Sequence, residues 1–303
     1  MPEKKVSLIG LGAMGRPMAL NWLKNGFELT VCDINQAVVE ELVKAGAKAA
    51  AGPAQAARAG DPVITMLPAD PQVKAVAYGP DGLLENMSPG QTLIDMTSLS
   101  PHTSIELGRQ AQAKGLKFMD APVSGGTVGA ENGSLTIMVG GDKEVLEANR
   151  HVFEAVGQRI FHIGPIGMGE TVKMVNQILV GINVIGMAEA FVLGVKLGAD
   201  PKTLYEVIRV SAGGSFMLDN RMPSFILKGD FKQPGFAVDL LKKDVGLAVD
   251  SAKVENLPLP LTAQVFQCLT MASASGRGAL DQTSFIEILE DLAGVKVRAE
   301  MDD

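Results

Sequence analysis

The chain begins with an apolar segment that runs directly into a glycine-rich turn. Residues 5–9 read as a buried strand, and the turn opens a helix predicted over residues 13–25. In a strand–turn–helix of this kind the first glycine allows a tight turn, the second lets the backbone approach a diphosphate, and the third lets helix and strand pack closely. The helix N-terminus adds free amide donors and a partial positive charge. The pattern predicts a dinucleotide site formed by Gly10, Leu11, Gly12, Ala13, Met14 and Gly15.

An acidic residue follows the next predicted strand and supports this interpretation. The apolar run 27–32 ends at Asp33, about 20 residues beyond the turn, where a carboxylate can accept hydrogen bonds from both ribose hydroxyls. The same carboxylate would repel a 2′-phosphate, and neither Ile34 nor Asn35 supplies a cation to hold one. The predicted cofactor is therefore NAD, with NADP as the alternative. Arg16 has two interpretations, a diphosphate contact or a solvated side chain.

The pattern of strands and helices divides the chain in two. Residues 1–163 alternate apolar strands with helices, which predicts a Rossmann-type α/β domain with a doubly wound, mostly parallel sheet. Residues 164–303 show no further alternating run and predict an all-helical domain, starting with a long helix over 169–197. The predicted strands are 5–9, 28–32, 62–66, 92–95, 117–120, 135–139 and 159–162, and the predicted helices between them include 13–25, 36–45 and 103–114.

Composition narrows the partners and the compartment. The net charge is −7 and no basic run is present, which argues against nucleic acid as a partner. Cys32 and Cys268 lie far apart and the three histidines are scattered, so no metal site is predicted. Because the first strand begins by Val6, we expect no targeting segment and a cytoplasmic protein. The apolar stretch 178–197 carries Asn183, Glu189 and Lys196, and so predicts a helix inside protein rather than a membrane span.

Three segments offer groups for proton transfer and for holding a small acid, and one of them, 242–244 in the predicted helical domain, has the alternative of an ordinary solvated charge cluster. Lys173 and Asn176 are three residues apart on the predicted long helix and so share one face. A partly desolvated lysine beside a positively charged ring has a lowered pKa and can exchange a proton with a hydroxyl group. The segment Ser124-Gly125-Gly126 follows a predicted strand end and can hold a carboxylate with its hydroxyl and amide groups. The simpler alternatives are a surface lysine and an ordinary turn.

Taken together, five segments resemble the β-hydroxyacid dehydrogenases, the family of 3-hydroxyisobutyrate dehydrogenases and tartronate semialdehyde reductases. The resemblance covers the full length in order, and it is carried by the segments 9–18, 65–68, 120–126, 167–177 and 243–244. It implies that Lys173 is the catalytic acid and base and that Asn176 and Gln177 contact the substrate. It also implies that Ser124, Gly125 and Gly126 hold the substrate carboxylate. On the cofactor side it implies contacts from Met66, Leu67, Pro68, Gln72, Thr97, Ser98 and Lys243.

Two positions refine the resemblance. Many family members have a second asparagine after the first, whereas this chain has Gln177, as tartronate semialdehyde reductases do. The 6-phosphogluconate dehydrogenases have histidine at the position of Asn176, so this chain fits that branch poorly. Segments 211–217 and 231–239 are expected to tune the choice of substrate, without indicating which one.

The function predicted from these observations is an NAD-dependent oxidoreductase (EC 1.1.1.-). It would interconvert a small 3-hydroxycarboxylate, such as 3-hydroxyisobutyrate or glycerate, and its semialdehyde. A reductase for glyoxylate, succinic semialdehyde, or a sulfonated or polyhydroxy acid is the alternative within the family. A dinucleotide-sensing protein without turnover is the alternative outside it. The resemblance also implies a homodimer or homotetramer, and it implies that the helical domain 164–303 serves substrate binding and oligomerisation.

Overall fold

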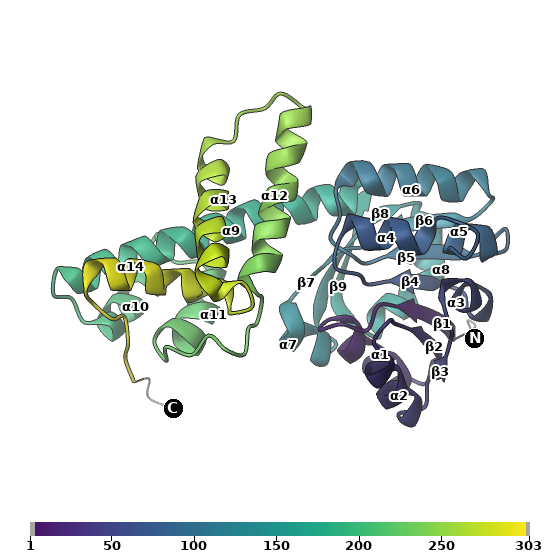
Figure 1. Cartoon of the computed structure of the whole chain (residues 1–303), viewed down its shortest axis with the longest axis horizontal. Coiled ribbons are helices and arrows are strands. Elements are labelled where there is room, and N and C mark those ends of the chain that lie inside the picture. The colour runs from purple at the N-terminus through teal and green to yellow at the C-terminus, as the bar shows by residue number, and fades with distance from the viewer. Residues whose placement is uncertain (1–3, 301–303) are drawn as a thin grey trace. The chain divides into compact units, whose positions relative to one another are not determined.

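A computed structural model describes residues 4–300, and the chain divides into two compact units, Met1–Lys173 and Met174–Asp303. The boundary predicted between 163 and 164 precedes helix α9, whereas the division between the units falls within that helix. Figure 1 labels the elements of both units, which are described separately below.

The first unit contains a single sheet of nine strands among the described residues. Its strands are β1 (Lys5–Ile9), β2 (Glu28–Cys32), β3 (Lys48–Ala49), β4 (Val63–Thr65), β5 (Thr92–Asp95), β6 (Lys117–Asp120), β7 (Val123–Ser124), β8 (Leu135–Gly141) and β9 (Gly157–Gly164). Its helices are α1 (Gly15–Lys24), α2 (Gln36–Lys44), α3 (Pro53–Ala59), α4 (Asp70–Ala77), α5 (Leu83–Asn86), α6 (Pro101–Ala113), α7 (Gly126–Glu131) and α8 (Lys143–Glu154).

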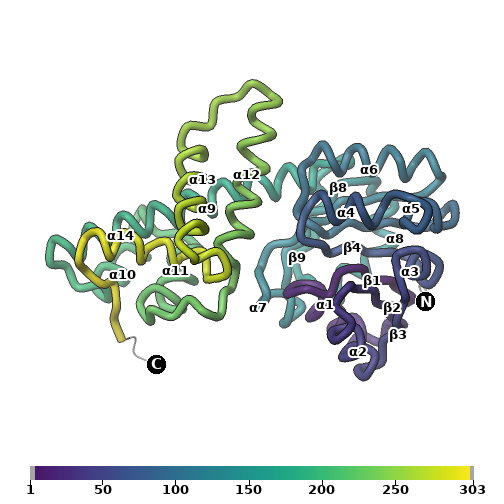
Figure 2. Tube along the Cα trace, viewed as in Figure 1, coloured from purple at the N-terminus to yellow at the C-terminus, as the bar shows by residue number. Residues whose placement is uncertain are grey.

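The order of the strands confirms the doubly wound fold. The sheet runs β3-β2-β1-β4-β5-β6-β8-β7, with β9 beside β8, and β1 to β6 are all parallel. Strand β1 therefore lies between β2 and β4, where the winding of the chain reverses, as the trace in Figure 2 shows. Ligands of such sheets bind beyond the carboxyl ends of the strands at this reversal. The glycine turn and Asp33 lie at these ends.

Helices cover both faces of the sheet (Figure 1). On one face α1 and α8 share a core that contains Trp22 and Phe153, and the Trp22 indole donates a 2.9 Å hydrogen bond to the Val152 carbonyl. On the other face α3, α5 and α6 bury Leu83 and Leu107. Strands β1, β2, β5 and β6 have the predicted bounds, because each is an apolar run with a clear end. The two-residue strands β3 and β7 were not predicted, since so short a strand has no periodic signal.

The second unit is helical, as predicted. Its described elements are α9 (Met168–Lys196), α10 (Pro201–Arg209), α11 (Phe216–Arg221), η1 (Met222–Ile226), α12 (Val238–Val254), α13 (Pro260–Ala272), η2 (Ser273–Arg277), η3 (Gln282–Phe285) and α14 (Ile286–Ala293). Its only described strand-like contact is a single bridge between Ala237 and Asp281. Phe191, Leu241 and Leu269 lie in its core.

Helix α9 is long and apolar enough, by length and hydropathy, to cross a membrane, and it is the only helix among the described residues that is. Within the helical unit one side of it is buried through Val184, Ala188 and Phe191. Another side leaves Leu179 and Leu193 more than half exposed. The prediction that this helix lies inside protein therefore holds for one side of α9 and not for the other.

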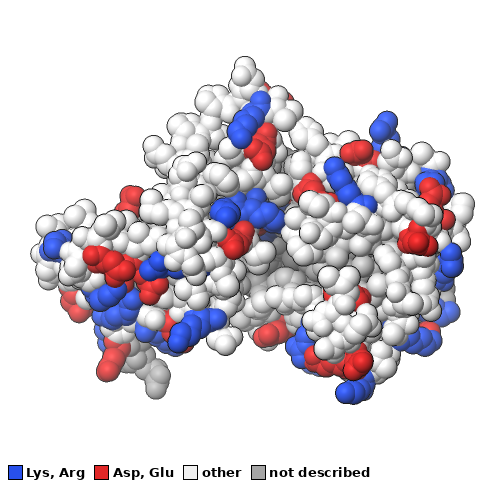
Figure 3. All heavy atoms as spheres, viewed as in Figure 1, with Lys and Arg blue, Asp and Glu red and all other residues white. Residues whose placement is uncertain are grey.

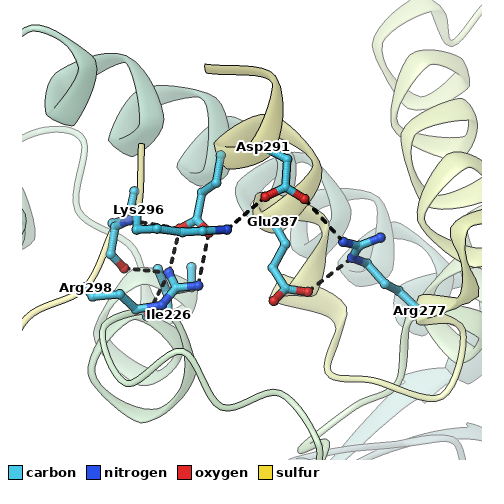
Figure 4. Close-up of polar contacts among 8 residues, drawn as sticks. Ile226, Arg277, Glu287, Asp291, Lys296 and Arg298 are labelled. Carbon is cyan, nitrogen blue, oxygen red and sulfur yellow. Dashed lines mark hydrogen bonds and ion pairs between the residues drawn. The ribbon is translucent and has the colours of Figure 1, made fainter. Parts of the chain in front are cut away.

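Hydrogen bonds and ion pairs, some of them to a buried carboxylate, hold the last part of the described chain in place (Figure 4). Glu290 on α14 is fully buried, and its carboxylate accepts the Val297 amide at 2.9 Å and pairs with the Arg298 guanidinium. Arg298 also donates to the Ile226 carbonyl at the end of η1. These contacts hold the segment after α14 against η1.

Candidate active site

The glycine turn has the geometry that its sequence predicts. Gly10 has φ 99°, and a Cβ added there would lie 2.2 Å from the Met66 carbonyl oxygen. A Cβ at Gly15 would lie 2.0 Å from the Gly10 carbonyl oxygen, so the fold itself requires glycine at both positions. A Cβ at Gly12 would meet nothing within 4 Å. The open space beside Gly12, at the start of α1, fits the diphosphate of a dinucleotide.

Asp33 lies against this turn at the end of β2. One carboxylate oxygen accepts the Leu11 amide at 2.6 Å and the other accepts the Asn35 amide at 2.8 Å. Ile34 is fully exposed, and Asn35 caps α2 through the Ala37 amide, so the residues that follow Asp33 bring no cation to it. Arg16 forms an ion pair with Glu41 on α2, and both side chains are exposed.

The predicted nicotinamide-side residues come together at the ends of β4 and β5. The Thr97 hydroxyl accepts the Leu67 amide at 3.0 Å, and the Met66 amide donates to the Ile9 carbonyl at 2.9 Å. Thr97 is fully buried, whereas Ser98 is half-buried. Thr97 therefore positions the loop after β4, and Ser98 is the more accessible of the two. Two further predicted residues follow: Pro68 is exposed in this loop and Gln72 is exposed in the first turn of α4.

A buried carboxyl group, not predicted as a site residue, organises the same edge of the sheet. Asp95 ends β5, and one of its oxygens accepts the Thr65 hydroxyl at 2.9 Å and the Thr97 amide at 3.0 Å. Its other oxygen has no hydrogen-bond partner. Burial, and secondarily the charge of Asp120 on the neighbouring strand, raise the pKa of Asp95 to about 6, against the effect of its hydrogen bonds.

The predicted carboxylate-binding turn follows β7. Ser124 ends that strand, paired with Thr136 of β8, and α7 begins at Gly126. Gly125 and Gly126 have φ of 138° and 63°, a backbone conformation that other residues rarely adopt.

The N-terminus of α9 is anchored to the sheet by a second buried carboxyl group. The Asp120 oxygens accept the Gly167 amide at 2.7 Å and the Glu170 amide at 2.9 Å, which satisfies two of the free donors of the helix. Burial raises the pKa of Asp120 in spite of these bonds. Glu170 in turn accepts the Leu99 amide at 3.0 Å. Lys173, one turn further along α9, is 6% exposed, so it is not the surface lysine of the simpler alternative.

Neither Asp120 nor Glu170 was predicted to position Lys173. In the sequence Asp120 stands out only as the last residue of a predicted strand and the first of the segment 120–126. The contact between Asp120 and the start of α9 could have been predicted from an acidic residue at the end of a strand and, much later in the chain, the glycine-rich start of a helix. Glu170 carried no sequence signal of its own.

In the helical unit a chain of polar contacts joins three predicted residues. The Asn176 amide donates to the Gln177 side-chain oxygen at 3.0 Å, and the Gln177 amide donates to the Asp244 carboxylate at 2.6 Å. Asp244 also pairs with Lys243 at 3.1 Å. Asp244 is buried and links α9 to α12, a role that the sequence did not reveal.

Comparison with known proteins decides the family. Residues 5–164 match the family described as the NAD-binding domain of 6-phosphogluconate dehydrogenase, and residues 167–289 match the NAD-binding family of NADP-dependent 3-hydroxyisobutyrate dehydrogenase. The chain is 43% identical to 2-(hydroxymethyl)glutarate dehydrogenase of Eubacterium barkeri, over 97% of each chain. It belongs to the β-hydroxyacid dehydrogenase family.

Further relatives agree with this assignment. L-threonate dehydrogenase of Cupriavidus necator is 38% identical, over 94% of this chain and 96% of that protein. The structure of 3-hydroxyisobutyrate dehydrogenase from Mycobacterium tuberculosis with L-serine superimposes with a TM-score of 0.87 at 30% identity, over 95% of this chain and 99% of that one. As a member of the β-hydroxyacid dehydrogenase family, the chain is an NAD(P)-dependent oxidoreductase of small hydroxy acids.

Proposed function

We propose that this β-hydroxyacid dehydrogenase uses NAD to interconvert a small 3-hydroxycarboxylate and its semialdehyde, with Lys173 as the acid and base. The supporting observation is the buried position of Lys173, one turn beyond a helix start that Asp120 fixes to the sheet. The bound nicotinamide supplies or accepts the hydride. Lys173 removes the hydroxyl proton in oxidation and returns a proton to the carbonyl oxygen in reduction.

The other predicted residues bind and orient. Ser124 and the amides of Gly125 and Gly126 hold the substrate carboxylate, and Asn176, with Gln177 behind it, orients the reacting oxygen. The turn 10–15, together with Met66, Leu67, Pro68, Gln72, Thr97 and Ser98, binds the cofactor. Lys243 contributes a cofactor contact. The hydrogen bonds of Gln177 with Asn176 and Asp244 support these roles, because they restrict the Asn176 amide to one orientation.

NAD rather than NADP is the cofactor we propose. The Asp33 carboxylate lies at the turn with both oxygens accepting backbone amides, and a 2′-phosphate placed there would meet its negative charge. No cation follows in Ile34 or Asn35 to offset that repulsion.

The relatives' names indicate the class of substrate. In both 2-(hydroxymethyl)glutarate and L-serine a CH₂OH group is attached to the carbon next to a carboxylate. We therefore propose a substrate with this element, such as 3-hydroxyisobutyrate or glycerate. The alternative is a reductase for glyoxylate, succinic semialdehyde, or a sulfonated or polyhydroxy acid. A panel of these acids and aldehydes, assayed by the absorbance of the reduced nicotinamide, distinguishes them.

The variant Lys173→Ala tests the catalytic assignment. We expect kcat to fall by about 10²-fold or more, because general acid–base catalysis is lost, while the dissociation constant of NAD measured by calorimetry stays nearly unchanged. Lys196→Ala is the matched control, since Lys196 is an exposed lysine of the same helix. A fully active Lys173→Ala enzyme would overturn the proposal. Binding of NAD without turnover of any panel compound would favour the dinucleotide-sensing protein.

We also propose that the protein is a cytoplasmic homodimer or homotetramer. Val175, Leu179, Leu193 and Leu197 are 50–78% exposed. Leu193 lies five turns from Val175 at about 3.6 residues per turn, so all four residues follow one side of α9. Exposed apolar side chains on one side of a helix are typical of a surface covered by protein, and we assign this row to a second copy of this chain.

A further inference from the structure

Three buried polar side chains follow one side of α9. Glu170, Lys173 and Gln177 are 1%, 6% and 4% exposed, and their spacing of three and then four residues places them on the same helix face. The exposed Val172 and Val175 lie on another face. The buried polar face therefore carries one acid and one base, a single turn apart.

A buried ammonium group needs a compensating charge. Burial alone disfavours a charged lysine by several kcal/mol in general, so buried lysines are either paired or neutral. Side chains three residues apart on a helix lie within about 5–6 Å at their Cβ atoms, and an opposite charge at such range favours the charged form. The backbone of Glu170 is fixed by Asp120 and its carboxylate accepts the Leu99 amide, so its position is defined at both ends.

Other charged groups on the neighbouring elements have hydrogen bonds or ion pairs of their own. Both Asp120 oxygens accept amides at the start of α9, and Asp95 faces Thr65 and Thr97. The segment 96–100 contains no ionisable side chain, and His102 on α6 is exposed. In the helical unit Asp244 is bound to Gln177 and paired with Lys243. Glu170 is the carboxylate on the same helix face as Lys173, and its hydrogen bond with the Leu99 amide orients it.

We propose that Glu170 is the counter-ion of Lys173 and keeps it an ammonium group, so that near neutral pH the enzyme is set up as an aldehyde reductase. This inference rests on the proposed role of Lys173. As the carbonyl is reduced, the proton leaves Lys173 Nζ for the substrate oxygen, and the lysine becomes a neutral amine that regains a proton from water. In oxidation Lys173 must first lose its proton, which Glu170 opposes. Oxidation therefore requires a higher pH than reduction.

The test is an NMR titration of Lys173 in the cofactor-free protein containing isotope-labelled lysine, with the signal assigned by its loss in Lys173→Ala. With a counter-ion the pKa of Lys173 is expected at or above the ordinary value of a lysine, whereas burial without one would bring it well below that value. A pKa well below the ordinary value in the unaltered protein would overturn the inference, and this measurement needs no variant at Glu170.

The variant Glu170→Gln adds an independent measurement. It keeps an oxygen for the Leu99 amide and removes the charge, so we expect the pKa of Lys173 to fall by about one unit or more. The acid limb of kcat/KM for oxidation should shift down equally, and Glu170→Asp should restore part of the shift. Glu189→Gln, an exposed acid further along α9, is the matched control and should leave both unchanged. Equal pKa values of Lys173 in the Glu170→Gln and Glu189→Gln proteins would refute the pairing.

Each of the two proposals can be refuted without refuting the other. The titration reports on Glu170 and Lys173 without cofactor, so a negative result leaves the Lys173→Ala assay valid. An active Lys173→Ala enzyme would instead overturn the proposed function, whatever the titration shows.

Discussion

At the scale of single residues, the glycine turn separates what the fold requires from what a ligand requires. A Cβ at Gly15 would lie 2.0 Å from the Gly10 carbonyl oxygen, whereas a Cβ at Gly12 meets nothing within 4 Å. We expect Gly15→Ala to lower the free energy of unfolding by about 2 kcal/mol or more through overpacking.

Gly12→Ala should leave thermal stability unchanged and weaken NAD binding by about tenfold or more, or about 1.4 kcal/mol. Thermal melts and calorimetry on the two variants check this, and tight NAD binding by Gly12→Ala would contradict it.

Asp33 provides the second prediction at this scale. Asp33→Asn keeps an oxygen for one backbone amide and removes the charge that opposes a 2′-phosphate. We expect kcat/KM with NADP to rise relative to NAD by about tenfold or more, since a charge repulsion of this kind is worth 1–2 kcal/mol. Steady-state kinetics with both cofactors measure the ratio. Glu41→Gln, which removes a charge from the exposed pair with Arg16, is the control. An unchanged ratio in Asp33→Asn would remove the argument for NAD.

At the scale of elements, the Asp95 carboxyl group links the ends of β4 and β5, and its pKa is higher than that of an ordinary aspartate. The pKa of Asp95 is raised from 3.8 to about 6, so between these values the folded protein binds more protons than the unfolded chain. The contribution of Asp95 to stability is therefore complete below about pH 4 and is lost as the pH rises through about 6.

Denaturant unfolding of Asp95→Asn tests this dependence. The asparagine keeps an oxygen for Thr65 and Thr97 and places a neutral amide where the unpartnered oxygen lies. We expect the unaltered protein to lose up to about 3 kcal/mol relative to Asp95→Asn between about pH 4 and pH 7. Parallel stability curves for the two proteins over that range would show that Asp95 titrates at its ordinary pKa.

At the scale of the whole molecule, charged and apolar surfaces are distributed differently. On the face drawn in Figure 3, small groups of lysine and arginine lie interspersed with aspartate and glutamate. Exposed apolar side chains occur in both units, and four of them, Val175, Leu179, Leu193 and Leu197, form a row along one side of α9. Among residues 4–300 no cluster of three metal-ligating side chains is present. We propose that a second copy of the chain covers this row.

The prediction at this scale concerns assembly. A charge at Leu193 would be buried in the proposed interface between copies, so we expect Leu193→Glu to shift the protein toward the monomer in sedimentation velocity. Leu292→Glu, on α14, is the matched control because Leu292 is also highly exposed and lies outside the row. A native protein that sediments as a monomer, or that partitions into membranes, would contradict the proposed assembly.

The sequence by itself determined the family and several of the elements. Apolar runs with clear ends fixed β1, β2, β5 and β6, the glycine spacing fixed the turn at 10–15, and the long helix from about 169 was evident from its composition. These features were predictable because they depend on neighbours within a few residues. The resemblance of five segments then identified Lys173 as the candidate acid and base.

Only the tertiary structure decided how that lysine is held. Asp120 caps α9 from about 50 positions earlier in the chain, Glu170 reaches Leu99, and Gln177 meets Asp244. The unsatisfied oxygen of Asp95 and the exposed row on α9 likewise depend on which surfaces the fold brings together and which it leaves uncovered. Burial and charge pairing across such separations have no local pattern in the sequence, because they arise from contacts that form only when the sheet and the helices are assembled.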